Sequence, residues 1–216
     1  MYVKDNMVPD PIVISPNQSV SEAMDIMSEN NLHRLPVVDG SGKLVGLVTE
    51  SVITSNTPNN ASSLSVYELN YLLNNLKIAD IMIRDVITID KEALLEEAAT
   101  IMRKSNIGCL PVVDENNNIE GIITHNDIFT AFIDLLGYNK NGTRYVINIT
   151  EDKTGIMESI AGIFKINDVS ISNLAVYSSS RGLEVVVISN GYNDISDKLK
   201  DAGYNVTSVI RLQQKF

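Results

Sequence analysis

The stretch Leu35-Pro36-Val37-Val38-Asp39 recurs 75 residues later as Leu110-Pro111-Val112-Val113-Asp114. Around it, residues 20–53 align with residues 95–128 without a gap, and 13 of the 34 aligned pairs are identical. An Asp-x-Met pattern extends the register upstream, at 5–7 and again at 80–82. Two copies of one sequence predict two copies of one fold, packed about a pseudo-two-fold axis. Such a pair forms clefts at its seam, and clefts are where small ligands bind.

Each copy is predicted to have the element order β-α-β-β-α. The helix signal begins at Ser19-Val20-Ser21-Glu22, a capping-box pattern after which apolar residues follow at helical spacing. Strands are expected at 11–14, 35–38 and 44–49 in the first copy and at 86–89, 110–113 and 119–124 in the second. We expect a polar loop at 54–63, a helix at 66–76 and core positions for Met24, Met27 and Met102.

A different pattern begins at Arg144. It predicts strands at 145–150, 169–177, 183–189 and 206–212, with one helix starting at 156 and another over 194–202. The order β-α-β-β-α-β is that of the ferredoxin-like split unit. The predicted fold class is therefore α+β, with repeated domains at 1–62 and 63–139 and a separate domain at 143–216.

Composition narrows the possible partners. A net charge of −10 argues against nucleic acid, whose binding needs many Lys and Arg contacts to phosphate, and against an anionic membrane surface. Cys109 is the single cysteine, so no internal disulfide can form. No apolar run reaches the ~18 residues of a membrane span, and the first residues lack a signal-peptide pattern. We therefore expect a cytoplasmic protein.

The most pointed motif is Gly-Ile-Ile-Thr-His-Asn-Asp at 121–127, where a predicted strand meets a helix. The Thr124 hydroxyl and the helix N-terminus suit a phosphate, and Asp127 can accept hydrogen bonds from ribose hydroxyls. Thr-x-x-Asp is also a capping box, so capping and ligand binding are both open. In the first copy Val52 replaces this aspartate, and the two clefts are therefore not expected to be equivalent.

These motifs resemble a tandem cystathionine-β-synthase (CBS) domain pair, or Bateman module, over residues 1–137. The resemblance implies a regulatory module that senses AMP, ADP, ATP or S-adenosylmethionine, with Thr124 at the phosphate and Asp127 at the ribose. It also implies an adenine pocket lined by Ile87, Cys109, Leu110 and Pro111. A second, weaker cleft would involve Arg34, Pro36 and Thr49. His33 and Arg34 could reach an anionic ligand across a cleft, or lie on the solvated surface.

The C-terminal part resembles an ACT domain, through its element order and the turn Asp152-Lys153-Thr154-Gly155-Ile156, in which Thr154 replaces a frequent proline. Such domains commonly pair their sheets between chains, and some bind an amino acid at this turn. The resemblance implies a site at Asp152, Gly155 and Ile156, completed by Asn173 of a partner chain; a plain tight turn is the alternative. A CBS pair followed by an ACT domain is similar to acetoin-utilisation proteins of the AcuB type.

No catalytic or metal-binding constellation stands out. His33 and His125 have no metal-ligand spacing, and no activated nucleophile is evident. We therefore predict a non-catalytic regulator that needs no cofactor, binds an adenosine ligand in the CBS cleft and forms a homodimer. One alternative is an amino-acid sensor with the CBS pair as dimer scaffold, and another is an assembly protein without a small ligand.

Overall fold

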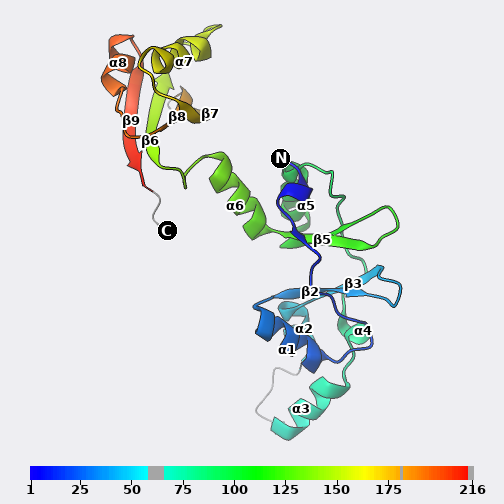
Figure 1. Ribbon diagram of the computed structural model, residues 1–216. Helices are drawn as coiled ribbons and strands as arrows, with labels where there is room; N and C mark the ends of the chain where they lie inside the picture. Colours follow the sequence, from blue (N-terminus) through cyan, green and yellow to red (C-terminus); the bar gives the residue numbers. More distant parts are fainter. Residues whose placement is uncertain (58–65, 181, 214–216) are drawn as a thin grey trace. The chain divides into compact units, whose positions relative to one another are not determined.

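A computed structural model describes residues 1–57, 66–180 and 182–213, so part of the predicted loop at 54–63 lies outside the described residues. The chain divides into two compact units, Met1–Ile128 and Phe129–Phe216 (Figure 1). Among the described helices, none combines the length and apolar composition that a membrane span requires.

The first unit holds both copies of the repeat. Its elements are η1 (Val3–Asp5), β1 (Val8–Pro9), α1 (Val20–Asn30), β2 (Arg34–Val38), β3 (Leu44–Thr49), α2 (Glu50–Asn56), α3 (Val66–Asn75), α4 (Ile78–Ile81), α5 (Leu95–Ser105), β4 (Cys109–Val113), β5 (Ile119–Thr124) and α6 (His125–Leu135), which continues into the second unit. Two small antiparallel sheets result, one in the order β1-β5-β4 and the other formed by β2 and β3.

The strands predicted at 11–14 and 86–89 are reduced to single bridges. Ile14 pairs with Val37 and Ile89 pairs with Val112, both in parallel. Pairing stops there because the chain turns directly afterwards, as the Gln18 N–H donates to the Ser15 carbonyl and the Ala93 N–H donates to the Asp90 carbonyl.

The predicted capping box of α1 is confirmed. Ser19 Oγ accepts from the Glu22 N–H at 3.2 Å, and Glu22 Oε2 accepts from the Ser19 N–H at 2.6 Å. Met27 on α1 and Met102 on α5 are buried, as expected. Met24 is 43% exposed, so its predicted core position is wrong. The buried stripe of α1 consists of Val20, Ala23 and Met27, and Met24 lies at its edge.

The two copies exchange their leading segments, residues 1–10 and 76–85. In the first segment, the Val3 N–H donates to the Ala93 carbonyl, and β1 pairs with β5 of the second copy. In the second segment, Ile83 bridges to Leu47 on β3 of the first copy. The predicted domain boundary at 62/63 follows the sequence repeat, but each copy is completed in space by the segment that precedes the other.

Two methionines of these segments account for two repeated glycines. A Cβ built on Gly121 would lie 2.5 Å from Met7 Sδ, and one built on Gly46 would lie 2.5 Å from Met82 Sδ. Real Cβ atoms do not approach sulfur so closely, so each methionine packs in space that only glycine leaves open. The recurrent Asp-x-Met and Gly positions are thus the two sides of one contact, made twice.

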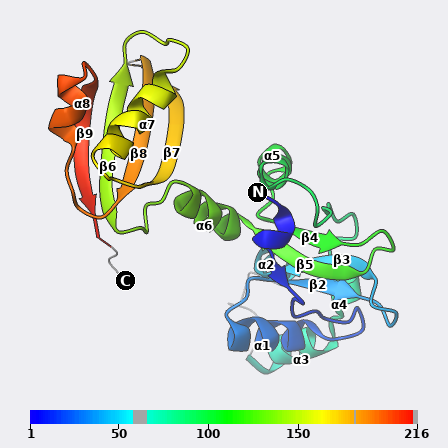
Figure 2. The ribbon, with the colours of Figure 1, turned by 45° about the horizontal axis from the view of Figure 1, so that its top comes forward.

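The second unit has the predicted order β-α-β-β-α-β. Its elements after α6 are β6 (Gly142–Ile149), α7 (Ile156–Ile166), β7 (Ile171–Ser179), β8 (Gly182–Asn190), α8 (Ser196–Asp201) and β9 (Asn205–Leu212). The antiparallel sheet has the order β7-β8-β6-β9, and α7 lies across it (Figure 2). Tyr145 and Phe164 are the largest buried side chains of this core and meet edge to face, with ring centroids 5.4 Å apart. Membership of the ACT family stays a prediction.

Candidate functional site

Two cavities lie at the seam between the copies, both within the first unit. The larger, which we call the Asp127 cavity, has a volume of about 540 Å³ and contains Thr124 and Asp127. The smaller, the Thr49 cavity, has a volume of about 270 Å³ and contains Thr49 and Ile87. Small-molecule sites usually measure ~300–1,000 Å³, so the Asp127 cavity is the better candidate.

Each cavity combines the strand end of one copy with the leading segment of the other. The Asp127 cavity is lined from the second copy by Gly108, Ile122 and Thr124–Asp127, and from the first by Val8, Asp10–Ile12, Asn30–Arg34 and Pro36. The Thr49 cavity is lined from the first copy by Arg34, Leu47, Thr49 and Ser51, and from the second by Ile83, Asp85–Ile87 and Asn106–Cys109. This crossed arrangement follows from the segment exchange.

The structure therefore regroups the predicted site residues. Ile87 and Cys109, expected beside Asp127, line the Thr49 cavity. Leu110 is fully buried and, like Pro111, is not among the residues that line either cavity. Conversely, Pro36 was expected in the weaker cleft around Thr49, and it lines the Asp127 cavity instead.

Several lining residues were not predicted as site residues from the sequence, among them Asp10 and Gly108. Asp10 and Asp85 pair at the same offset of 75 as the other repeated residues, and this was the available signal. No sequence pattern around Gly108 pointed to a site. Its importance comes from Arg34 of the other copy, whose side chain passes close to it.

One carboxylate oxygen of Asp127 caps helix α6, and the other is available to accept hydrogen bonds from a ligand. Its Oδ2 accepts from the Thr124 N–H and from Thr124 Oγ1, both at 2.7 Å, so the capping alternative is present in the structure. Its Oδ1 has no hydrogen-bond partner among the described residues. Since a carboxylate oxygen carries two lone pairs, Oδ1 can accept from a ligand while Oδ2 keeps the cap.

The equivalent motif of the first copy offers a ligand fewer hydrogen-bond acceptors. Thr49 caps α2 by accepting from the Val52 N–H at 3.3 Å, and its Oγ1 lies 2.9 Å from Ser51 Oγ. The Val52 side chain supplies no polar atom where the second copy has a carboxylate. The Thr49 cavity thus lacks the acceptor that Asp127 provides.

Arg34 lies where the two cavities meet and lines both. Its guanidinium passes Gly108, where an added Cβ would lie 3.1 Å from Nη1. Its neighbour His33 lines only the Asp127 cavity of the two, and His33 Nδ1 lies 2.8 Å from Glu50 Oε2. His33 is exposed, as the surface reading expects, while both residues also border the Asp127 cavity, so a contact with an anionic ligand stays a prediction.

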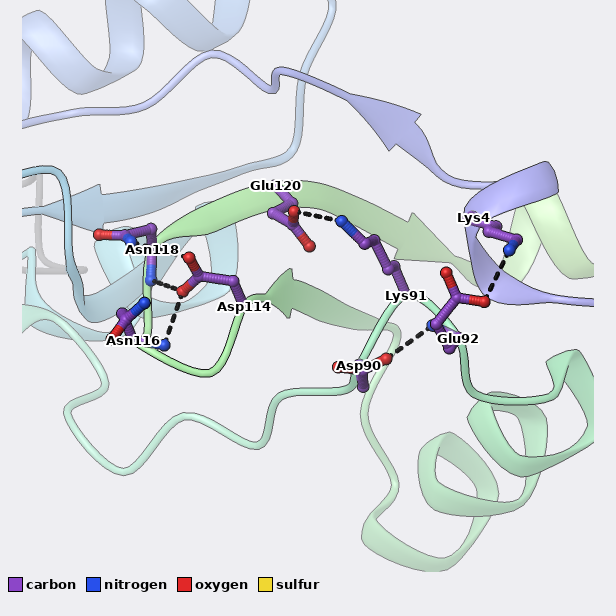
Figure 3. A network of polar contacts seen from close by, with 8 residues as sticks. All are labelled: Lys4, Asp90, Lys91, Glu92, Asp114, Asn116, Asn118 and Glu120. Atoms are coloured by element: carbon purple, nitrogen blue, oxygen red, sulfur yellow. Dashed lines mark hydrogen bonds and ion pairs between the residues drawn. The ribbon is translucent and has the colours of Figure 1, made fainter.

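Polar contacts connect the exchanged first segment and β5 to the loop at residues 90–92 (Figure 3). Lys4 donates to Glu92, and Lys91 donates to Glu120 on β5, each at 2.6 Å. The hydrogen bond to Glu120 raises the pKa of Lys91, and the bond to Glu92 raises the pKa of Lys4. The segment that carries Asp10 meets β5 directly, through the pairing of β1 with β5 and the Asp10 N–H that donates to the Glu120 carbonyl at 3.2 Å.

The predicted amino-acid site is not assembled within one chain. Gly155, with φ of +88°, precedes α7, and a Cβ there would meet nothing within 4 Å. Asp152 is exposed and Ile156 is half-buried. Asn173 Nδ2 donates to the Leu135 carbonyl at 2.7 Å, so this amide fastens the end of α6 in its own chain. Among the described residues, no cluster of three His, Cys, Asp or Glu could hold a metal.

A curated protein is similar to most of this chain. Inosine-5'-monophosphate dehydrogenase of Nitrosopumilus maritimus is 30% identical over 188 residues, which cover 87% of this chain and 34% of that protein. The chain thus spans about a third of the length of this curated relative.

Three solved structures are similar. The CBS domain pair of MJ0100, in complex with 5'-methylthioadenosine and S-adenosyl-L-methionine, is 34% identical with a TM-score of 0.51, covering 61% of this chain and 99% of that one. CBSX2 of Arabidopsis thaliana in complex with AMP is 27% identical with a TM-score of 0.51, covering 62% and 96%. A Vibrio cholerae protein assigned to acetoin utilization (AcuB) is 30% identical with a TM-score of 0.53, covering 63% and 93%.

A family model described as CBS domain matches residues 3–56 and 78–134. These two matches coincide with the two copies of the repeat and make up just over half of the 216 residues. The chain therefore belongs to the CBS-domain family and carries a tandem pair of these domains.

Proposed function

We propose that this chain is a regulatory protein that binds an adenosine-containing ligand with an anionic group in the Asp127 cavity. The observation that carries the proposal is the open Oδ1 of Asp127, in a cavity of about 540 Å³ that also contains Arg34. A carboxylate acceptor and a guanidinium in one cavity match a ribose and an anion in one ligand. Solved CBS pairs with AMP or S-adenosyl-L-methionine support this ligand class.

Each part of the ligand has a place. Asp127 accepts from the ribose hydroxyls, and the adenine packs on the apolar wall formed by Ile12, Pro36 and Ile122. The anionic group, a phosphate or the carboxylate of S-adenosylmethionine, lies toward Arg34 and the N-terminus of α6. Ile87 and Cys109 would contact a ligand only in the Thr49 cavity.

Regulation follows from the crossed construction. Because both copies line the Asp127 cavity, a ligand there binds the two copies to each other and favours one packing of the pair. Its effect on that packing is limited to its differential affinity for the two states, typically ~1–3 kcal/mol. In this proposal the chain catalyses no reaction, forms a homodimer, and uses its C-terminal unit, as an ACT domain, to transmit the change to the dimer or a partner.

The test is calorimetry on the full chain with AMP, ADP, ATP, S-adenosylmethionine and adenosine, beside a panel of amino acids. Asp127→Asn is the sharpest variant, since its side-chain oxygen can keep the cap while the open atom becomes a donor. We expect at least about a tenfold loss of affinity, because the ribose donors would face N–H groups. Asp134→Asn, also on α6, is the matched control and should bind as wild type.

Saturable binding that Asp127→Asn leaves unchanged would contradict the proposed site. Absence of binding by every adenosine compound would contradict the function. Amino-acid binding lost in Gly155→Ala, where alanine would be strained at a φ of +88°, would instead favour the C-terminal turn as the ligand site.

A further inference from the structure

Arg34 is a single cation shared by two cavities. It is the only Arg or Lys among the residues that line the Asp127 cavity, and also the only one among those that line the Thr49 cavity. Arg34 is half-buried, and its guanidinium makes no hydrogen bond or ion pair with the described residues. Its donors are therefore available to a ligand from either side.

The other charges make both cavities depend on Arg34. Asp10 and Asp127 line the Asp127 cavity, and Asp85 lines the Thr49 cavity. The whole chain carries a net charge of −10. An anion that entered either cavity without contacting Arg34 would meet carboxylates and no permanent positive charge.

The sequence repeat shows why there is one guanidinium and not two. Arg34 aligns with Cys109, and His33 aligns with Gly108. A symmetric pair would supply an arginine from each copy, one for each cavity. Here Cys109 supplies no charge, and Gly108 leaves the space past which Arg34 extends.

We propose that anionic ligands in the two cavities compete for Arg34, so that a phosphate-bearing ligand in the Asp127 cavity weakens anion binding in the Thr49 cavity. This rests on the proposed function, because it needs an anionic adenosine ligand in the Asp127 cavity. A phosphate monoester carries roughly 1.5 to 2 negative charges at pH 7, which already exceeds the single charge of the guanidinium. A second phosphate then meets a net negative centre, so sharing Arg34 is unfavourable.

The coupling is reciprocal by thermodynamic linkage: an anion in the Thr49 cavity weakens the phosphate-bearing ligand in the Asp127 cavity by the same factor. The binding of a ligand without an anionic group, such as adenosine, is not affected by this competition. The CBS pair would then respond to the ratio of two anionic ligands and not only to the concentration of one.

The experiment measures each cavity separately in the full chain by NMR. The amides of Thr124 and Asp127 report on one cavity, and those of Thr49 and Ile87 on the other. AMP and adenosine are the probes. AMP should bind the Thr49 cavity of Asp127→Ala, whose Asp127 cavity is disabled, at least about fivefold more tightly than it binds the Thr49 cavity of wild type once the Asp127 cavity is filled. Adenosine should show no such difference.

In the Arg34→Gln background the AMP difference should disappear, while Arg103→Gln, which removes the same charge away from the cavities, should keep it. Equal AMP constants for the Thr49 cavity with and without Asp127, coupling that survives Arg34→Gln, or a Thr49 cavity that takes no AMP in any variant would each overturn the proposal. Failure of both AMP and adenosine to shift Thr124 and Asp127 in wild type would overturn the proposed function, and the coupling with it.

Discussion

Met7 Sδ lies 2.5 Å from the place where a Cβ on Gly121 would be, and Gly121 stands on β5, three residues before Thr124. The contact joins the first copy's leading segment to the strand that positions the ligand motif. Met82 repeats it on Gly46 in the opposite direction. The pair of contacts therefore holds the exchange that builds both cavities.

Gly121→Ala should destabilise the chain by about 1–3 kcal/mol, because the added methyl overlaps the Met7 sulfur and lies 3.0 Å from the Val8 carbonyl oxygen, which belongs to the backbone. Urea unfolding followed by circular dichroism measures the change. Met7→Ala in the Gly121→Ala background should recover part of the loss, since the overlap disappears. Gly162→Ala, on α7 with nothing within 4 Å of an added Cβ, is the control and should be neutral or slightly stabilising. Equal stability of Gly121→Ala and wild type would contradict the packing argument.

Gly108→Ala should weaken AMP binding while leaving adenosine binding nearly unchanged. The new methyl lies 3.1 Å from Arg34 Nη1 and displaces the guanidinium, whereas the ribose contacts at Asp127 are untouched. Calorimetry with both ligands measures the difference, and Gly40→Ala, where an added Cβ meets nothing within 4 Å, serves as control. An equal loss for AMP and adenosine would show that the methyl distorts the whole cavity.

Asp127→Ala should cost about 0.5–2 kcal/mol of stability without any ligand, because the hydrogen bonds from the Thr124 N–H and hydroxyl are lost at the start of α6. Asp127→Asn should cost much less, since its side-chain oxygen can accept the same bonds. Chemical denaturation of the two variants checks this. Equal losses of stability in the two variants would contradict the capping role of the Asp127 side chain.

The turn at Asp114 should lose its contribution to stability in acid. The Asn118 side-chain amide, followed by the Asn118 and Asn116 N–H groups, lowers the pKa of Asp114 below its ordinary value of 3.8. A lowered pKa in the folded state means that the contribution is present above pH 3.8 and is lost as the pH falls from there through the lowered value.

Comparing the free energy of unfolding of wild type and Asp114→Asn between pH 7 and pH 3 tests this sign. The difference should be constant at neutral pH and shrink only below pH 3.8. Glu115→Gln, at the next residue of the same turn, is the control, and its difference from wild type should not follow that course. A difference for Asp114→Asn that grows toward low pH would contradict the assignment.

Much of this protein could be read from local pattern. The Ser19–Glu22 capping box, the β-α-β-β-α-β order of the second unit and the capping contact between Thr124 and Asp127 depend on residues close in sequence, so they were predictable. The exposure of Met24 was not predictable, because helical spacing shows which side of a helix is apolar but not where the buried stripe ends. The short pairing of Ile14 and Ile89 also escaped prediction, since it depends on where the chain turns away.

By itself, the sequence determined that the fold is duplicated and that one copy carries a carboxylate, Asp127, where the other has Val52. Only the tertiary structure decided which residues face that carboxylate. The packing of the two copies brings Ile12 and Arg34 of the first copy to the cavity of Asp127, and Ile87 of the second copy to that of Thr49. The physical reason is packing between residues far apart in the chain, such as Met7 on Gly121, whose complementary shapes no local pattern reveals.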